Sequence, residues 1–129
     1  MLGKNIDILT IYEGVKVISD QAFYDNAISF LNIPNSVEHI GQNSFSDNQI
    51  TTLEIGSGLK MLGNYAFARN KLTTITLHAT TPPEIFSNSY PPFDENPTIQ
   101  QILVPASAFN AYKNHSYWST FGELITAND

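Results

Sequence analysis

The sequence predicts a repeat solenoid that is mainly β, with short turns and 3-10 segments between its strands. Phenylalanines recur every 22 residues, and asparagines keep the same interval. These two columns are Phe23, Phe45 and Phe67, and Asn26, Asn48 and Asn70. Apolar residues follow the same register in the columns Ile6, Ile28, Ile50 and Leu72; Leu9, Leu31, Leu53 and Ile75; and Ile11, Ile33, Ile55 and Leu77. Several independent columns in one register indicate stacked, equivalent units.

Each unit begins with a short half-buried strand, because its first residues alternate between apolar and polar. The units span residues 6–27, 28–49 and 50–71, and a fourth begins at Leu72. Gly, Pro and Asn follow each strand and supply turns, as in Pro34-Asn35-Ser36. Stacking places like strands in parallel, about 4.8 Å apart. One unit cannot bury its own apolar face, so neighbouring units must cover each other.

The asparagine column has two interpretations. A buried amide can satisfy backbone N–H and C=O groups that the tight turns leave without partners, and it can reach the adjacent unit. We expect this structural role. The alternative is an asparagine array that binds a ligand.

Composition limits the classes of function. The 129 residues suit one domain, and only 14% of them are charged. The net charge of −6 disfavours nucleic acid and anionic membrane surfaces as partners. No cysteine is present, which excludes disulfides and thiolate metal sites. We find neither a signal peptide nor an apolar run long enough to span a membrane.

The repeat resembles the BspA-type leucine-rich repeat of bacterial surface proteins. The resemblance rests on Pro34-Asn35-Ser36-Val37-Glu38-His39-Ile40-Gly41, followed by Ser44-Phe45 and Asn48. The third unit matches through Leu59, Leu62-Gly63, Ala66-Phe67 and Asn70, and the first through Val15, Ile18, Ala22-Phe23 and Asn26. The departures fall at turn positions: Tyr12 and Gly56 replace the family's Pro, and Ser19 replaces a Gly. The resemblance implies a right-handed leucine-rich-repeat stack.

The C-terminal part resembles the family's closing segment. Residues 99–105 predict a last strand in the register of residues 28–34, and 106–113 predict a short helix with Ser107 as a candidate N-cap. The resemblance implies a C-terminal helical cap, which would hide the open apolar edge. We therefore expect a single domain over 1–129, with repeats over 6–97 and the last strand and cap over 98–129.

The period fails in a proline-rich insertion at 79–97, which holds five of the seven prolines. We interpret it as an extended loop before the cap. The functional alternative is a rigid loop that presents Phe86, Tyr90 and Phe93 to a partner.

The sequence contains no motif for nucleotide binding, hydrolysis or calcium. We therefore expect no enzyme activity, no catalytic residues, no cofactor and no metal site. His39 is expected to be packed and His78 to be exposed. Asp25 and Asp47 share a column that could bind a cation, but a solvated turn is the expectation.

The candidate binding surface is the outward face of the predicted strands, which the resemblance makes the concave face. One row carries Thr10, Asn32, Glu54 and Thr76, and the next carries Ile8, Phe30, Thr52, Thr74 and Gln101. The two apolar anchors, Ile8 and Phe30, leave two alternatives open. They form a binding patch, or a preceding coil covers them, because no N-terminal cap is visible and the chain reads as a piece of a longer stack.

The resemblance implies a non-catalytic protein-interaction module, adhesin-like or ligand-binding, in a secreted or cell-surface bacterial protein. The expected partner is an unidentified host-matrix or bacterial surface protein, with no nucleic acid and no membrane insertion. The alternative is a passive structural spacer within a larger cell-wall protein. Localisation follows from the resemblance alone, since the chain shows no signal peptide, and a cytoplasmic location stays open.

Overall fold

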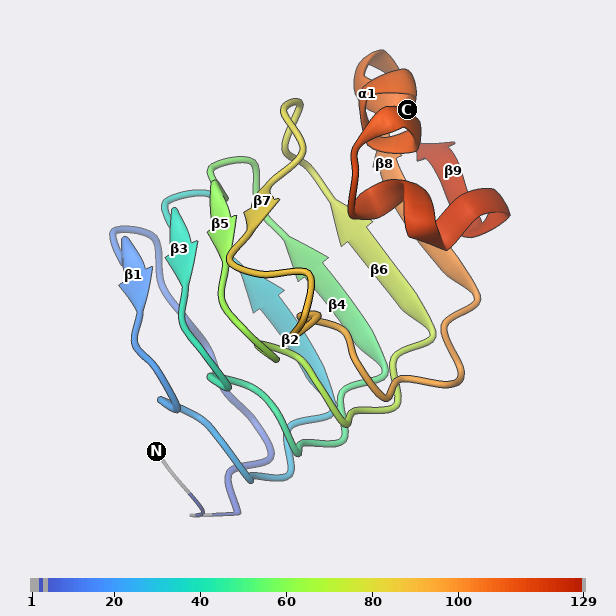
Figure 1. Ribbon diagram of the computed structural model, residues 1–129. Helices are drawn as coiled ribbons and strands as arrows, with labels where there is room; N and C mark the ends of the chain where they lie inside the picture. Colours follow the sequence, from blue (N-terminus) through green and yellow to red (C-terminus); the bar gives the residue numbers. More distant parts are fainter. Residues whose placement is uncertain (1–2, 4, 129) are drawn as a thin grey trace.

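The computed structural model describes residues 3 and 5–128, in which two parallel sheets face each other across the core (Figure 1). The five-stranded sheet has the order β2 (Phe30–Ile33), β4 (Thr52–Ile55), β6 (Thr74–Leu77), β8 (Gln101–Pro105) and β9 (Ile125–Asn128). The four-stranded sheet has the order β1 (Val17–Ile18), β3 (His39–Ile40), β5 (Met61–Leu62) and β7 (Glu84–Ile85). Each of the strands β1 to β6 therefore pairs with its counterpart one coil further along, where a coil is one repeat unit.

The strand register confirms the period. Leu31 lies opposite Leu53, which lies opposite Ile75, and all three are buried. Strands β2 and β4 alternate between exposed and buried residues, as predicted for half-buried strands. The apolar columns consequently become continuous rows of core side chains between the two sheets.

The phenylalanine column forms a ladder of nearly parallel rings inside the core. Ring centroids are 5.4 Å apart for Phe23 and Phe45 and 5.3 Å apart for Phe45 and Phe67. Phe93 continues the stack at 5.5 Å from Phe67, and Trp118 lies 5.8 Å beyond Phe93. Aromatic pairs at this spacing add about 0.5–1.5 kcal/mol each beyond the area they bury.

The asparagine column is structural, as expected. The Oδ1 atom of Asn48 accepts the N–H of Ile28 at 3.0 Å. Its Nδ2 donates to the carbonyls of Phe23 and Phe45 at 3.0 and 3.1 Å. Asn70 makes the equivalent bonds one coil later. Each amide thus joins two coils and satisfies buried backbone groups that a turn leaves over.

The interpretation of 79–97 as an extended loop is wrong. Strand β7 pairs with β5, and the N–H of Phe67 donates to the Pro92 carbonyl at 2.8 Å. Asn96 makes the same bonds as Asn70, accepting from Leu72 and donating to Phe67 and Phe93. The segment belongs to a fourth coil, and the residues that it has beyond the 22-residue period are inserted at several places instead of in one loop. Equivalent positions are 84 − 61 = 23, 93 − 67 = 26 and 102 − 75 = 27 residues apart.

The C-terminal segment comprises η1 (Ala106–Ala108), α1 (Phe109–Asn114), η2 (Trp118–Leu124) and β9. The prediction of Ser107 as N-cap is wrong: Ser107 lies within η1, and Ala108 precedes α1 without a side-chain cap. Trp118 is fully buried, and its Nε1–H donates to the Pro83 carbonyl at 2.9 Å. This bond ties the segment to the fourth coil. Strand β9, which the sequence did not indicate, extends the five-stranded sheet beside β8.

Candidate interaction surface

The outward side of the five-stranded sheet brings together most of the predicted binding residues. Six of them lie in two rows across β2, β4 and β6. The rows are Phe30, Thr52 and Thr74, and Asn32, Glu54 and Thr76. We call these six residues the sheet-face rows. The residues of β2 and β4 are exposed and those of β6 are half-buried.

Ile8 and Thr10 lie on the chain segment that precedes β1, and both are exposed. A hollow of about 390 Å³ lies between residues 7–9 and strands β2 and β4. Ile8 and Phe30, which are 83% and 68% exposed, border this hollow. In the described part of the chain, no backbone hydrogen bond joins residues 8–11 to β2. The two apolar anchors therefore flank an opening at the edge of the sheet.

The polar end of the sheet-face rows carries a hydrogen-bonded contact between His78 and Glu54. Nε2 of His78 lies 2.5 Å from Oε2 of Glu54, and both side chains are about half exposed. The exposure of His78 confirms the sequence prediction. A hollow of about 600 Å³ lies beside this pair and includes Tyr12 and Asn32 in its lining. The surface thus offers apolar contacts at one end and hydrogen-bonding groups at the other.

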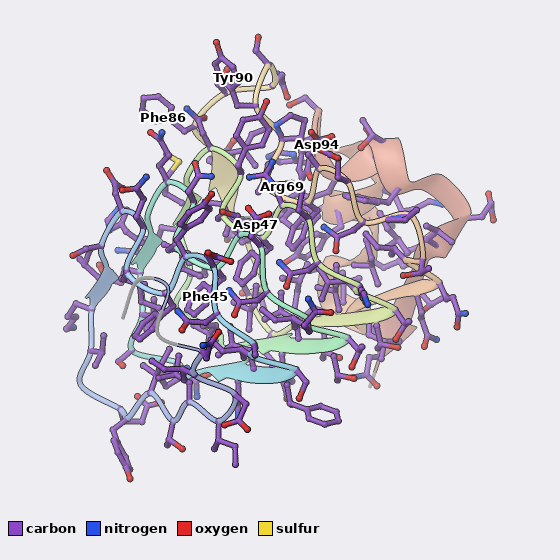
Figure 2. The ribbon with its side chains drawn as sticks, turned by 90° about the horizontal axis from the view of Figure 1, so that it is seen from below. Phe45, Asp47, Arg69, Phe86, Tyr90 and Asp94 are labelled. Atoms are coloured by element: carbon purple, nitrogen blue, oxygen red, sulfur yellow. The ribbon has the colours of Figure 1, made fainter. Side chains whose placement is uncertain are left out.

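Only two of the three aromatic residues predicted in the proline-rich segment are exposed. Phe86 is 72% and Tyr90 48% exposed, and both project outward (Figure 2). The expectation that Phe93 is presented to a partner is wrong, since Phe93 is only 4% exposed and belongs to the phenylalanine ladder. The signal was present in the sequence: Phe93 and Asn96 keep the three-residue spacing of Phe67 and Asn70.

The predictions for His39 and for the column of Asp25 and Asp47 have different outcomes. The expectation that His39 is packed is wrong, because β3 turns Ile40 into the core and leaves His39 exposed. In the column that was considered for a cation, Arg69 Nε lies 2.8 Å from Asp47 Oδ2. The Asp47 carboxylate therefore has an intramolecular partner of opposite charge. Among residues 3 and 5–128, no three side chains that ligate metals come together.

The comparison with protein families supports the interpretation of the chain as a stack of leucine-rich repeats. The model of the BspA type leucine-rich repeat region matches residues 3–91 in six copies, which is more than half of the chain. The chain belongs to this family. No curated protein matches it.

The match ends at residue 91, just before Phe93 and Asn96 continue the two ladders. Leucine-rich-repeat domains generally mediate protein–protein interactions and are generally non-catalytic. Within the part of the chain that the structure describes, no helix is long and apolar enough to cross a bilayer.

Proposed function

We propose that this chain is a non-catalytic protein-binding module, a single right-handed solenoid domain over 1–129 with repeats over 6–97 and a C-terminal helical cap. The observation that carries the proposal is the surface formed by the sheet-face rows together with Ile8 and Thr10. It combines two exposed apolar anchors with hydroxyl and amide groups on a regular sheet. Protein interfaces use such a combination: apolar anchors at the centre and a polar rim around them.

The partner we propose is a protein of the host matrix or of a bacterial surface, bound by an adhesin-like secreted or surface protein. The sheet-face rows contain one charged residue, Glu54, and this carboxylate is already paired with His78. Such a surface recognises a partner by shape and hydrogen bonds more than by charge, so binding should depend little on salt. Family membership supports the cell-surface setting, which fractionation of producing cells would test.

Phe30 provides the decisive experiment. The purified chain is immobilised and exposed to purified extracellular matrix proteins while binding is followed by surface plasmon resonance. We expect Phe30→Ala to weaken binding about tenfold or more, the usual effect of removing an aromatic anchor. Tyr90→Ala is the control, because Tyr90 is an exposed aromatic residue that lies outside the sheet-face rows and outside the strands of both sheets. Equal losses for the two variants, or no binding to any matrix protein, would overturn the proposal.

A further inference from the structure

A trough runs across the outward side of the four-stranded sheet, away from the sheet-face rows. Its volume is about 330 Å³, and all four coils contribute to its lining. One rim is formed by Val17, His39 and Met61, which lie opposite one another on β1, β3 and β5. The trough therefore follows the direction in which the coils stack and meets one equivalent position per coil.

The floor of the trough consists of bare backbone at Gly41 and Gly63. A Cβ atom at Gly41 would lie 2.5 Å from Asp20 Oδ1, and one at Gly63 would lie 2.7 Å from the Gln42 nitrogen. Side chains are therefore excluded from the floor by the close stacking of the coils. The fourth coil differs, because it places Phe86 in the column of the two glycines. The Phe86 N–H donates to the Leu62 carbonyl, just as the Gly63 N–H donates to the Ile40 carbonyl one coil earlier. The exposed ring of Phe86 consequently stands at the end of a flat floor.

The second rim presents one planar polar group from each of the first three coils: Asp20, Gln42 and Asn64. Asp20 Oδ1 accepts the Gln42 backbone N–H at 2.8 Å, which holds the carboxylate in place. The side chains of Gln42 and Asn64 form no hydrogen bond with any described residue. The Oδ1 atom of Asn64 is buried and has no hydrogen-bond partner among the described residues. Neighbouring groups on this rim are separated by the coil spacing of about 4.8 Å.

We propose that this trough binds a linear, uncharged glycan, with a sugar ring on Phe86 and hydroxyl groups on the polar rim. The C–H groups on a sugar face carry partial positive charge, which the negative face of an aromatic ring attracts. A carboxylate accepts hydrogen bonds from hydroxyl groups, and an amide both donates to hydroxyl groups and accepts from them. A rim that repeats one polar group per coil matches a ligand that is itself a repeating polymer.

Two other classes of ligand fit less well. A peptide that adds a strand needs a free sheet edge, but here the backbone N–H groups of Gly41, Gly63 and Phe86 already bond the preceding coil. An anionic polymer would meet the Asp20 carboxylate and a chain of net charge −6. The Phe86 ring and the polar rim thus favour a glycan. The backbone N–H groups that already bond the preceding coil, and the negative charge, disfavour the other two ligands.

The test uses the full chain and four soluble probes: hexasaccharides of β-1,4-glucose, α-1,4-glucose, β-1,4-mannose and β-1,4-N-acetylglucosamine. Binding is measured by isothermal titration calorimetry and by NMR shifts of the backbone amides that line the trough. We expect millimolar or tighter binding of at least one probe, with shifts concentrated at Gly41, Gly63 and Phe86. Phe86→Ala should lower the affinity about tenfold, and Gln42→Ala should lower it less.

Tyr90→Ala is the matched control, since Tyr90 is an exposed aromatic of the same coil outside the trough lining, and it should bind as the wild type does. Phe86 and Gln42 are exposed, so circular dichroism should show all three variants folded. The proposal is overturned if none of the four probes binds, if Phe86→Ala binds like wild type, or if heparin shifts the trough amides more than any neutral probe. Loss of protein binding in Phe30→Ala has no bearing on this result, because the two surfaces lie on different sheets.

Discussion

The two ends of the coil stack use the same core columns and bury them to very different degrees. In the first coil Leu9, Ile11 and Phe23 are only partly buried, and a hollow of about 390 Å³ opens among them. At the other end Phe93 is covered by the rings of Trp118 and Phe121, with centroids 5.8 and 6.3 Å away. A column position therefore determines which way a side chain points, while the neighbouring coil determines how much stability it contributes.

The largest difference between the ends should appear when one aromatic residue is removed from each. Trp118→Ala leaves a cavity at the covered end, so we expect the free energy of unfolding to fall by about 3–5 kcal/mol. Tyr12→Ala in the first coil should change it by about 0.5 kcal/mol or less, because Tyr12 is 75% exposed. Urea denaturation followed by circular dichroism measures both. Similar losses at the two ends would show that burial is a poor guide to stability along the stack.

Between the ends, the asparagine ladder should make a large contribution of its own. Asn48→Ala leaves the Ile28 N–H and the carbonyls of Phe23 and Phe45 without this partner inside the core. We expect a loss of about 3 kcal/mol, since each buried unsatisfied group costs about 1–3 kcal/mol. Gln49→Ala, at an exposed neighbour, is the control and should be nearly neutral. If the two variants unfold at the same urea concentration, the ladder is not a source of stability.

The covered end should also be the alkali-sensitive end. Burial raises the pKa of Tyr112 and of Tyr117 above the ordinary value of 10.0, because desolvation disfavours the phenolate. The stabilisation is complete below about pH 10 and declines above it, where the unfolded chain releases protons that the folded chain retains. Each tyrosine should lower the free energy of unfolding by about 1.4 kcal/mol per pH unit in that range. Urea titrations from about pH 9 to 11 should therefore show a smaller decline for Tyr117→Phe than for wild type, and identical slopes would contradict the assignment.

The smallest expected effect is a gain. Ser44 lies in the column of Ala22 and Ala66, and its fully buried Oγ has no hydrogen-bond partner in the described part of the chain. Ser44→Ala removes this unsatisfied group without changing the shape of the column, so stability should rise by about 1 kcal/mol. Thermal unfolding should then shift upward by several degrees. A lower melting temperature would mean that the hydroxyl has a partner, such as a buried water.

The ladders could be predicted from the sequence because equivalent residues in successive coils meet equivalent partners. Phe93 and Asn96 were missed because the fourth coil lengthens in several small steps, which breaks the spacing without breaking the contacts. The orientation of His39 was missed because a two-residue strand offers no alternation to count. Strand β9 was missed because it follows a helical segment, although its Ile125 lies opposite Ile102 and continues the column of Ile75.

The sheet-face rows and the trough also differ in how far the sequence predicts them. The sheet-face rows follow from strand alternation, so the sequence located all six of their residues. The trough depends on Phe86 reaching the column of Gly41 and Gly63, which requires the one-residue shift between β5 and β7. A fixed period cannot reveal that placement, because it assigns the glycine column of the fourth coil to residue 85 instead.

The lengthened fourth coil also has a consequence for how such proteins diversify. Its ladder residues keep their partners although the stretch from Ile85 to Pro92 is longer than its counterpart from Leu62 to Ala66, and Asn88 and Ser89 in that stretch are exposed. Mutation can therefore add or replace residues there without disturbing the core. The same stretch is a natural graft point, where an epitope or a recognition peptide could be inserted into an otherwise unchanged scaffold.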